Sequence, residues 1–432
     1  MIWDNQSETM KRDDITTLQA ERLGNLLSRL YKRVPFYRER MEKNGIRPEH
    51  VRHMSDLKDL PFTTKEELRT VYPFGMLASD KDDIVEIHTS SGTTGIPVVD
   101  AYTAGDINIW GEVMARCLTM AGATRADIIQ NAYGYGLFTG GMGVHYGARK
   151  IGAMVIPISG GNTKRQLAIM RDFKPTILTC TPSYSLYMAE AGREEDMDFS
   201  KVGLKAGVFG AEPWSDSMRK DIQRKLHLKA FDIYGLTEII GPGVANECSK
   251  HEGLHVFEDH FYPEIIDPKT GKVLPDGEKG ELVITTLTKE GTPLLRYRTR
   301  DITWLNHEPC SCGRTHVRMH RLLGRTDDML IIRGVNVFPS QIEEVLLKIE
   351  EVEPHYQLVV ERRDQLDELE VQVEMNENMF SDEIKNLENM EKQISAQLYG
   401  ILNIHARVKL VEPRTISRSE GKAKRIIDKR PR

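Results

Sequence analysis

Apolar residues in the first half of this chain follow two patterns. Near the N-terminus, leucines that lie close to one helical face predict a helix: Leu18, Leu23, Leu26, Leu27 and Leu30. From Ile84 to about Asp232, short β-branched runs alternate with longer amphipathic stretches; the runs are 128–129, 154–158, 176–180 and 207–209, and the stretches include 104–120 and 215–226. This alternation predicts βαβ units and a largely parallel sheet.

The pattern changes twice further along. Between His255 and Trp304, strands and strong turns at 267–271 and 275–277 predict a small antiparallel sheet or barrel. After 324–328 a β-α-β-β-α-β unit is expected, with strand 329–332, helix 340–349, strands 356–361 and 369–375, helix 382–398 and strand 407–411.

These patterns predict an α/β protein with two domains. The large N-terminal domain, residues 1–326, would hold mostly parallel sheets and a small β-barrel-like part. The small C-terminal domain, residues 327–432, would be α+β. Because the junction near Asp327 is short, we expect it to act as a hinge.

Composition excludes several classes of protein. A chain of 432 residues is long enough for two or more cores, and its net charge of -5 indicates no nucleic-acid partner. No apolar run approaches the roughly 18 residues that span a bilayer, and residues 1–14 lack the apolar core of a signal peptide. We therefore expect a cytoplasmic protein without a membrane partner. Five cysteines in so long a chain predict reduced thiols or a metal site.

A loop rich in glycine and hydroxyl groups follows the strand-like run 84–88: Ser90, Ser91, Gly92, Thr93, Thr94 and Gly95. Its free backbone N–H groups and hydroxyls suit a triphosphate. The Gly-Lys-Ser/Thr ending of a Walker A loop does not occur in this chain, so the phosphate charge must be met elsewhere. Alone, the loop is equally consistent with a plain surface turn.

Four further segments contain residues suited to a nucleotide. Two of them follow apolar strands, where a parallel sheet binds its ligand. One of these combines an aromatic ring, a hydroxyl and a carboxylate, which suit a purine, a phosphate and Mg²⁺. Each segment alone also fits an ordinary turn, strand end or solvated tail. The segments are 210–213, 234–238, 297–301 and the basic tail around Lys422.

Together these five segments, in this order and over nearly the whole chain, resemble the adenylate-forming superfamily of acyl-CoA synthetases, luciferases and nonribosomal adenylation domains. Segments 131–138, 258–268 and 333–339 are similar to the phenylacetate-CoA ligase branch. The resemblance implies a two-step reaction. A carboxylate attacks the α-phosphate of ATP and releases pyrophosphate, and coenzyme A then displaces AMP to form a thioester.

The resemblance also implies the roles of individual residues. Lys422 would be the mobile lysine that neutralises charge at the α-phosphate, with Lys424 as the alternative, and Glu238 would hold Mg²⁺. The family's loop often carries a lysine after its last glycine, whereas Ile96-Pro97 stand here. The ATP site would comprise the loop 90–95 together with Ala211, Glu212, Pro213, Asp232, Tyr234, Gly235, Thr237, Asp301 and Arg325.

The acyl and coenzyme A sites are also expected at named positions. The stretch 133–143 alternates aromatic residues with glycines, which suits a flat ring, although core aromatics would give the same pattern. The expected acyl pocket consists of Tyr133, Tyr135, Gly136, Phe138 and Gly210. Rotation about Asp327 would bring a coenzyme A segment to the site, consisting of Arg333, Gly334 and Val335.

A metal site is expected among the cysteines. Cys310 and Cys312 flank a tight turn, and Cys248 precedes His251 and His255 in a region that the strand pattern could bring nearby. Three thiolates and one imidazole would form a closed structural Zn²⁺ site. The expected ligands are Cys248, His255, Cys310 and Cys312, with His251 or His316 as alternatives to His255. Cys117 and Cys180 fit buried apolar positions.

The expected function is ATP-dependent ligation of phenylacetate or a related aryl acid to coenzyme A, and the resemblance suggests a homodimer. Two alternatives are an adenylyltransferase of the same fold, similar to coenzyme F390 synthetase, and an adenylate-binding sensor without catalysis. The presence of Glu238, Asp301, Arg325 and Lys422 argues against the sensor.

Overall fold

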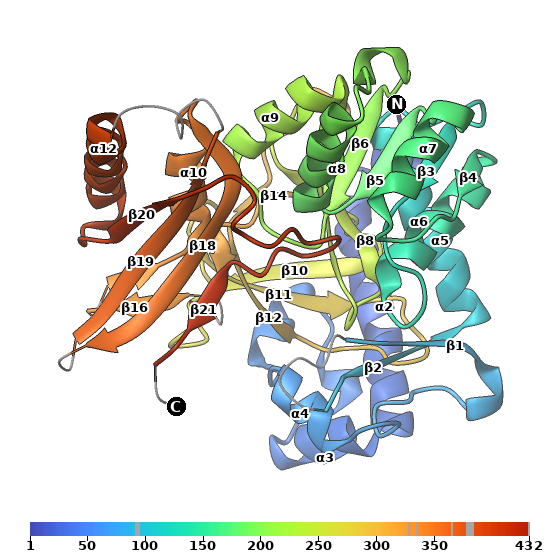
Figure 1. Ribbon diagram of the computed structural model, residues 1–432. Helices are drawn as coiled ribbons and strands as arrows, with labels where there is room; N and C mark the ends of the chain where they lie inside the picture. The colour runs from blue at the N-terminus through green and yellow to red at the C-terminus, as the bar shows by residue number, and fades with distance from the viewer. Residues whose placement is uncertain (91–95, 327–328, 334, 364–365, 377–383, 431–432) are drawn as a thin grey trace.

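The computed structural model describes residues 1–90, 96–326, 329–333, 335–363, 366–376 and 384–430. It has a large N-terminal part and a smaller C-terminal part that lie side by side (Figure 1). The residues 91–95 of the expected phosphate loop, Asp327 of the expected hinge and Gly334 of the expected coenzyme A segment lie outside the described residues.

Helices begin the chain, as the leucine pattern predicts: α1 (Asn5–Glu8), α2 (Arg12–Arg33), α3 (Pro35–Lys43) and α4 (Lys65–Thr70). The sequence 63–67 contains two overlapping capping boxes, and the structure uses the second, in which Thr64 and Glu67 cap α4. Thr63 is instead fully buried. Its backbone N–H donates to Arg296 O at 3.0 Å, which ties the start of α4 to the strand region near Tyr297.

The central sheet has nine strands in the order β13-β14-β9-β8-β7-β6-β5-β3-β4. Strands β4, β3, β5, β6 and β7 are parallel, which confirms the βαβ prediction, and the remaining pairs are antiparallel. The parallel strands are β3 (Ile128–Asn131), β4 (Met154–Ile156), β5 (Ile177–Cys180), β6 (Ala206–Gly210) and β7 (Lys229–Leu236). The others are β8 (Gly241–Glu247), β9 (Leu254–Val256), β13 (Leu305–Asn306) and β14 (Arg318–Met319).

Both faces of the parallel strands are covered. Neighbouring residues point to opposite faces, so Ile177 joins the core under one helix layer and Leu178 joins the core under the other. The first layer contains α5 (Ala104–Met120) and α6 (Thr139–Ile151). The second contains α7 (Thr163–Phe173), α8 (Pro182–Glu194) and α9 (Asp216–Leu226). Helix α5 has the bounds that the sequence predicts.

Two smaller sheets complete the N-terminal part. Strands β1 (Ile84–Thr89) and β2 (Val99–Thr103) form an antiparallel pair around the expected phosphate loop. The predicted antiparallel region forms a sheet of four strands in the order β10-β11-β12-β15. These are β10 (Phe261–Ile266), β11 (Gly280–Thr286), β12 (Tyr297–Thr303) and β15 (Gly324–Arg325).

The C-terminal part has its own core, formed by apolar residues between Leu330 and Val408. It contains the sheet β20-β19-β18-β21, the hairpin β16–β17 and two helices. Its elements are β16 (Leu330–Ile332), β17 (Val335–Val337), α10 (Pro339–Leu346), β18 (Val352–Arg363), β19 (Leu366–Met375), α12 (Ile384–Leu402), β20 (Arg407–Val411) and β21 (Ile426–Asp428). The sequence pattern did not reveal β17 or β21.

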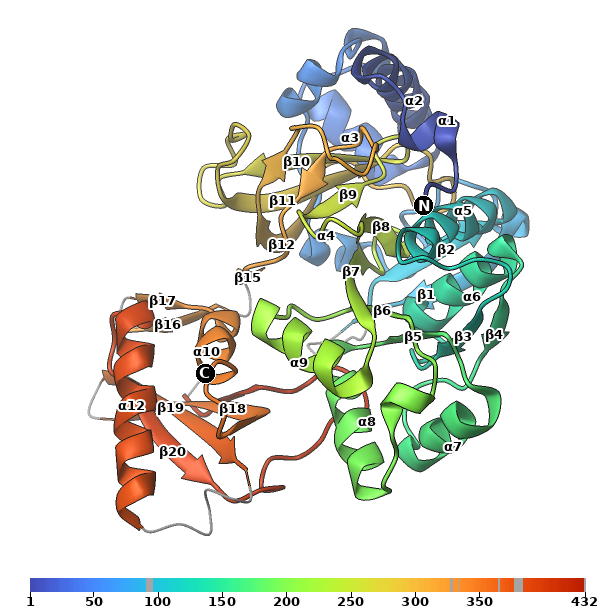
Figure 2. The same ribbon diagram turned by 90° about the horizontal axis from the view of Figure 1, so that it is seen from above.

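A segment between β20 and β21 leaves this core and reaches the N-terminal part near α8, as Figures 1 and 2 both show. It carries Lys422. Among the described residues, no helix combines the length and apolar character that crossing a bilayer requires.

Candidate functional site

Three polar residues stand directly after neighbouring parallel strands. Thr181 follows β5, Glu212 lies two residues beyond β6, and Glu238 lies two residues beyond β7. Because β5, β6 and β7 are adjacent and parallel, their carboxyl ends meet at one edge of the sheet. This edge is where open α/β sheets bind ligands, so the predicted site segments do come together.

The two ends of the expected phosphate loop are joined. Ser90 is buried, its N–H donates to Val98 O at 2.9 Å, and its Oγ accepts from Val98 N at 3.0 Å. Helix α4 contributes a further contact, because Arg69 Nε donates to Ile96 O at 3.0 Å. Hydrogen bonds therefore hold the residues on both sides of the loop, Ser90 and Ile96 to Val98, in place.

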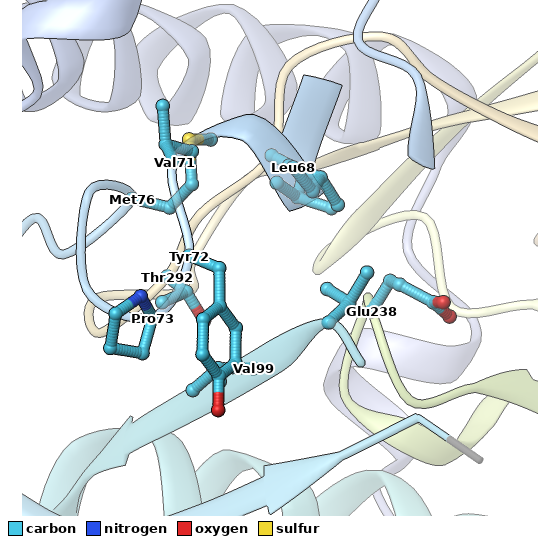
Figure 3. Close-up of a pocket in the computed structure, with 10 residues that line it drawn as sticks. Leu68, Val71, Tyr72, Pro73, Met76, Val99, Glu238 and Thr292 are labelled. Atoms are coloured by element: carbon cyan, nitrogen blue, oxygen red, sulfur yellow. The ribbon is translucent and has the colours of Figure 1, made fainter. Parts of the chain in front are cut away.

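Glu238 forms an ion pair that the sequence analysis missed. Its carboxylate is 6% exposed, and its Oε1 lies 2.9 Å from Lys65 Nζ at the start of α4. Glu238 also borders a small hollow that is lined mainly by apolar residues, among them Leu68, Val71 and Met76. Figure 3 shows its carboxylate pointing away from Tyr72 on the opposite wall. A buried carboxylate beside a hollow is a suitable oxygen ligand for Mg²⁺.

Asp301 is held by two neighbours. Tyr234 Oη donates to its Oδ2 at 2.6 Å, and Arg325 donates to its Oδ1 at 3.0 Å, because Asp301 on β12 pairs with Arg325 on β15. Burial, together with the negative charge of Asp301, raises the pKa of Tyr234 well above its usual value. Tyr234 therefore remains a neutral donor, and the three side chains form one polar group at the sheet edge.

Two predicted site glycines have packing roles. A Cβ on Gly235 would lie 2.0 Å from Gly241 O, and one on Gly210 would lie 2.3 Å from Ile233 O. Ala211 has a positive φ of 72°, which turns the chain sharply before Glu212 and Pro213. Thr237 is half-buried on the turn before Glu238.

Asp232 lies in a buried network on β7. Its N–H donates to Glu247 Oε2 at 3.1 Å, and Glu247 forms an ion pair with Arg219 at 2.6 Å. Burial, reinforced by the charge of Glu247, raises the pKa of Asp232 to about 7. These neighbours belong to β8 and α9, so these contacts tie β7 to both elements, and the role of Asp232 in the ATP site stays a prediction.

The aromatic stretch divides into buried and exposed residues. Tyr133 is only 8% exposed and packs in the core. Tyr135 is half-buried, and its hydroxyl accepts from Asn131 Nδ2 at 2.7 Å. Gly136 and Phe138 are exposed, and Gly136 has a φ of 107°. None of the predicted acyl-pocket residues lines the hollow beside Glu238.

The segment that carries Lys422 contacts the carboxyl edge on both sides of that residue. Thr181 Oγ1 donates to Gly421 O at 2.9 Å, and Ala423 N donates to Glu212 Oε2 at 3.0 Å. The other oxygen of Glu212 accepts from Ser183 N at 2.7 Å, so both of its oxygens are engaged. Lys422 and Lys424 are both exposed, and Lys424 also lines a separate hollow between the two parts.

The expected coenzyme A segment lies on its own domain in this arrangement. Arg333 is exposed, has a φ of 51°, and its Nε donates to Asp367 O at 3.1 Å. Val335 is half-buried and begins β17.

The structure brings together the four expected metal ligands, Cys248, His255, Cys310 and Cys312, whose ligand atoms lie within 4.8 Å of one another. Cys248 Sγ lies 3.8 Å from Cys310 Sγ, and Cys312 Sγ lies 3.4 Å from His255 Nε2. In a tetrahedral site with Zn–S bonds of about 2.3 Å, two sulfurs are about 3.8 Å apart, so the residues fit the ion.

The two alternative histidines have other partners. His251 Nδ1 lies 3.1 Å from Glu247 Oε2, and His316 Nε2 contacts Ser7 O at 3.0 Å.

Sequence reasoning also missed the residues that dock the two parts on each other. Glu190 on α8 accepts from Arg418 at 2.6 Å and lies 3.2 Å from His355. Burial alone would raise the pKa of Glu190, but the hydrogen bonds from His355 and Arg418 outweigh it and lower the pKa to about 2. No motif marks such pairs, because their partners are more than 150 positions apart in the chain.

Comparison with known proteins agrees with this geometry. A family model for AMP-binding enzymes matches residues 16–288, and a model for the C-terminal domain of AMP-binding enzymes matches residues 334–430. The chain is 48% identical to the phenylacetate-coenzyme A ligase of Thermus thermophilus, with 100% of both chains covered. It is 49% identical to the enzyme of that name from Escherichia coli, over 98% of this chain and 97% of the relative.

Solved structures show the same fold. The chain superposes on 2-hydroxyisobutyryl-CoA ligase in the postadenylation state with 2-HIB-AMP at a TM-score of 0.94 and 27% identity, covering 99% of this chain and 92% of that one. Against the thioesterification state of that enzyme, with 28% identity and the same coverage, the TM-score is 0.74. The two parts of this chain are thus arranged as in the first of these states. The chain belongs to the phenylacetate-coenzyme A ligase family of AMP-binding enzymes, and it is an AMP-forming acid–thiol ligase.

Proposed function

We propose that this enzyme activates phenylacetate, or a closely related arylacetic acid, with ATP and transfers the acyl group to coenzyme A. The relatives of nearly half identity over the whole chain are phenylacetate-coenzyme A ligases. The contacts of the Lys422 segment with Thr181 and Glu212, at the sheet edge that Glu238 also follows, support the proposal most directly. The acyl-pocket assignment of Tyr135, Gly136 and Phe138 stays a prediction.

In the first step, the acid carboxylate attacks the α-phosphorus, the bond to the bridging oxygen breaks, and pyrophosphate leaves. Negative charge on the carboxylate and on the phosphate must approach each other, so a cation between them lowers the barrier. Lys422 is the proposed cation, because its segment is held at the carboxyl edge. Bound at Glu238, Mg²⁺ would neutralise further phosphate charge.

We also propose binding residues for the ribose and for the phosphates of ATP. Asp301, fixed by Tyr234 and Arg325, would accept from ribose hydroxyls, and the loop 90–95 would bind the pyrophosphate that leaves. Lys65 orients the Glu238 carboxylate through their ion pair. Arg69, one turn further along α4, donates to Ile96 O at 3.0 Å, beside the loop that lacks a lysine of its own.

In the second step, the coenzyme A thiolate attacks the acyl carbon and AMP leaves. We propose that the C-terminal part rotates about Asp327, withdraws Lys422 and presents the segment 333–335 to the pantetheine arm. Support comes from the exposed position of Arg333 in this arrangement and from the second, differently arranged state known for 2-hydroxyisobutyryl-CoA ligase.

Incubation with ATP, Mg²⁺, phenylacetate and coenzyme A tests the proposal. Stoichiometric AMP, pyrophosphate and phenylacetyl-coenzyme A are expected. Transfer of AMP to a hydroxyl without thioester would favour the adenylyltransferase, and absence of ATP turnover with a range of aryl acids would favour the sensor.

We also propose that Cys248, His255, Cys310 and Cys312 bind one structural Zn²⁺. Support comes from the separations of their ligand atoms and from their origin in three adjacent segments of the central sheet. Arg314, which follows Cys312 closely, pairs with Glu8 of α1, so the metal would also fix the N-terminal segment. Elemental analysis of the purified protein should find one zinc per chain. Cytoplasmic location and homodimerisation stay predictions.

A further inference from the structure

We propose that Thr163, Thr181 and Glu212 form a clamp that positions Lys422 for adenylate formation, with Glu420 as the residue that the clamp grips. The inference rests on the proposed role of Lys422. It assigns Glu212 to the positioning of the lysine segment, whereas the family resemblance implies only that this residue belongs to the ATP site. It also assigns functions to Thr163, which lies in no motif, and to Glu420, which lies in the tail around Lys422 but has no role assigned from the sequence.

The grip on Glu420 is specific. Its Oε1 accepts from Thr163 Oγ1 at 3.0 Å and from Thr163 N at 3.4 Å, at the first residue of α7. A carboxylate is favoured there by the unpaired N–H groups and the dipole of the helix. Gly161 leaves the necessary room, since a Cβ at this position would lie 2.9 Å from Glu420 Oε2.

The other two contacts flank Lys422 directly. Thr181 caps α8 and also donates to Gly421 O at 2.9 Å, and Glu212 accepts from Ala423 N at 3.0 Å. Residues 420, 421 and 423 are therefore all held, while the side chain of Lys422 is exposed. Fixing the backbone on both sides limits where the ammonium can go, which is how a flexible lysine becomes a positioned one.

The clamp also connects to the expected acid site. Glu420 lies against the turn 159–162, in which Ser159 Oγ accepts from Tyr135 N at 3.2 Å. Gln166 on α7 donates to Ser159 O at 2.7 Å, so the same turn supports both Tyr135 and the seat of Glu420. A shift of the Tyr135 loop would therefore move the clamp.

The contacts are hydrogen bonds of a kind that can be broken and remade. Glu420 is exposed, and water can replace the partners of its carboxylate. Such contacts suit a segment that must hold Lys422 during one half-reaction and release it before the other. Removing one of them should therefore favour the released state.

The test uses the full-length enzyme with Glu420→Ala, which leaves every N-terminal side chain unchanged. Glu412→Ala is the matched control, because Glu412 is also exposed on this tail and its carboxylate has no hydrogen bond or ion pair among the described residues. Pyrophosphate release with ATP and phenylacetate measures the first half-reaction. Thioester formation from supplied phenylacetyl-adenylate and coenzyme A measures the second.

Glu420→Ala should slow adenylate formation about five- to tenfold and leave thioester formation unchanged. Glu420→Gln, which keeps an acceptor, should lose less, and Glu412→Ala should behave as wild type. Hydrogen–deuterium exchange of the peptide 419–425 should rise in Glu420→Ala without substrate, because the Ala423 amide loses its protection.

Equal loss in both half-reactions, or unchanged adenylation with unchanged exchange, would overturn the clamp. A wild-type enzyme that forms no phenylacetyl-adenylate would overturn the proposed substrate instead. The exchange of 419–425 would then still decide the clamp, because it requires no substrate.

Discussion

The Cys/His cluster and the Lys422 segment both join parts of the chain that are far apart in sequence, but they do so in different ways. The cluster lies beside one sheet: His255 is on β9, which pairs with β14, and the cysteines lie in the connections between strands of the same sheet. Three of the four ligands are buried. The Lys422 segment is held across two separate cores by hydrogen bonds to Thr163, Thr181 and Glu212. The first arrangement suits a permanent connection and the second suits a reversible one.

This difference follows from what each contact would cost to break. Opening the cluster would disrupt strand pairing and expose buried thiols, whereas releasing the segment exchanges a few hydrogen bonds for bonds to water. An enzyme with two half-reactions at one site needs both kinds of contact, because one part must stay fixed while the other moves.

The largest effect is expected from Lys422→Ala. Adenylate formation should fall about 100-fold or more, since a cation that stabilises developing charge is lost. Thioester formation from supplied adenylate should change little. Pyrophosphate release and thioester assays measure the two steps, and Lys424→Ala is the control. If Lys424→Ala slowed adenylation more than Lys422→Ala, then Lys424 and not Lys422 would be the mobile lysine.

Cys312→Ser tests the Cys/His cluster, the permanent connection of the two. We expect loss of the zinc and a melting temperature lower by roughly 5 to 10 °C, because metal binding contributes to folding. Elemental analysis and calorimetry measure the two effects. Ser311→Ala, on the exposed residue between the two cysteines, is the control. If Cys312→Ser lost its zinc but kept the melting temperature of the wild type, the metal would not contribute to the stability of the fold.

Asp232→Asn probes the same rigid region through pH. Burial and the charge of Glu247 raise the pKa of Asp232 to about 7, so the folded state favours the protonated form. The contribution of Asp232 to the free energy of unfolding is therefore complete below about pH 3.8, which is the pKa of this group in the unfolded chain. It is lost as the pH rises to about 7, the pKa in the folded protein. Asparagine does not titrate. The free energy of unfolding of Asp232→Asn should therefore gain about 2 kcal/mol relative to wild type between pH 5.5 and 8.5.

Urea unfolding at the two pH values measures this gain. A constant difference between the two proteins across this range would mean that Asp232 is ionised in the fold throughout.

The smallest effect is expected from Glu190→Gln on the reversible side. This change weakens the contacts with Arg418 and His355, so the docked arrangement should be less populated and adenylation should fall about two- to fivefold. Thioester formation should stay the same or rise. Half-reaction rates measure the split, with Glu195→Gln on the exposed end of the same region as control. A loss confined to thioester formation would contradict the assignment.

Much of the architecture could be predicted because it depends on local patterns. The period of the apolar residues gave the parallel sheet and α5, and the turn signals located the antiparallel sheet. The site segments 90–95, 210–213 and 234–238 were found because each combines glycine with polar residues at the end of a strand. Strands β17 and β21 were missed, since both are only three residues long and too short to show a period of apolar residues.

The sequence by itself determined the elements and the chemistry available at the strand ends, because hydrophobic period and residue type are local properties. Only the tertiary structure decided the partners. It showed that Lys65 pairs with Glu238, that Tyr234 and Arg325 hold Asp301, and that His255 rather than His251 lies among the cysteines. It also placed Glu212 under the Lys422 segment. Most of these contacts join residues more than 50 positions apart, and their geometry is set by how distant elements pack, which no local pattern encodes.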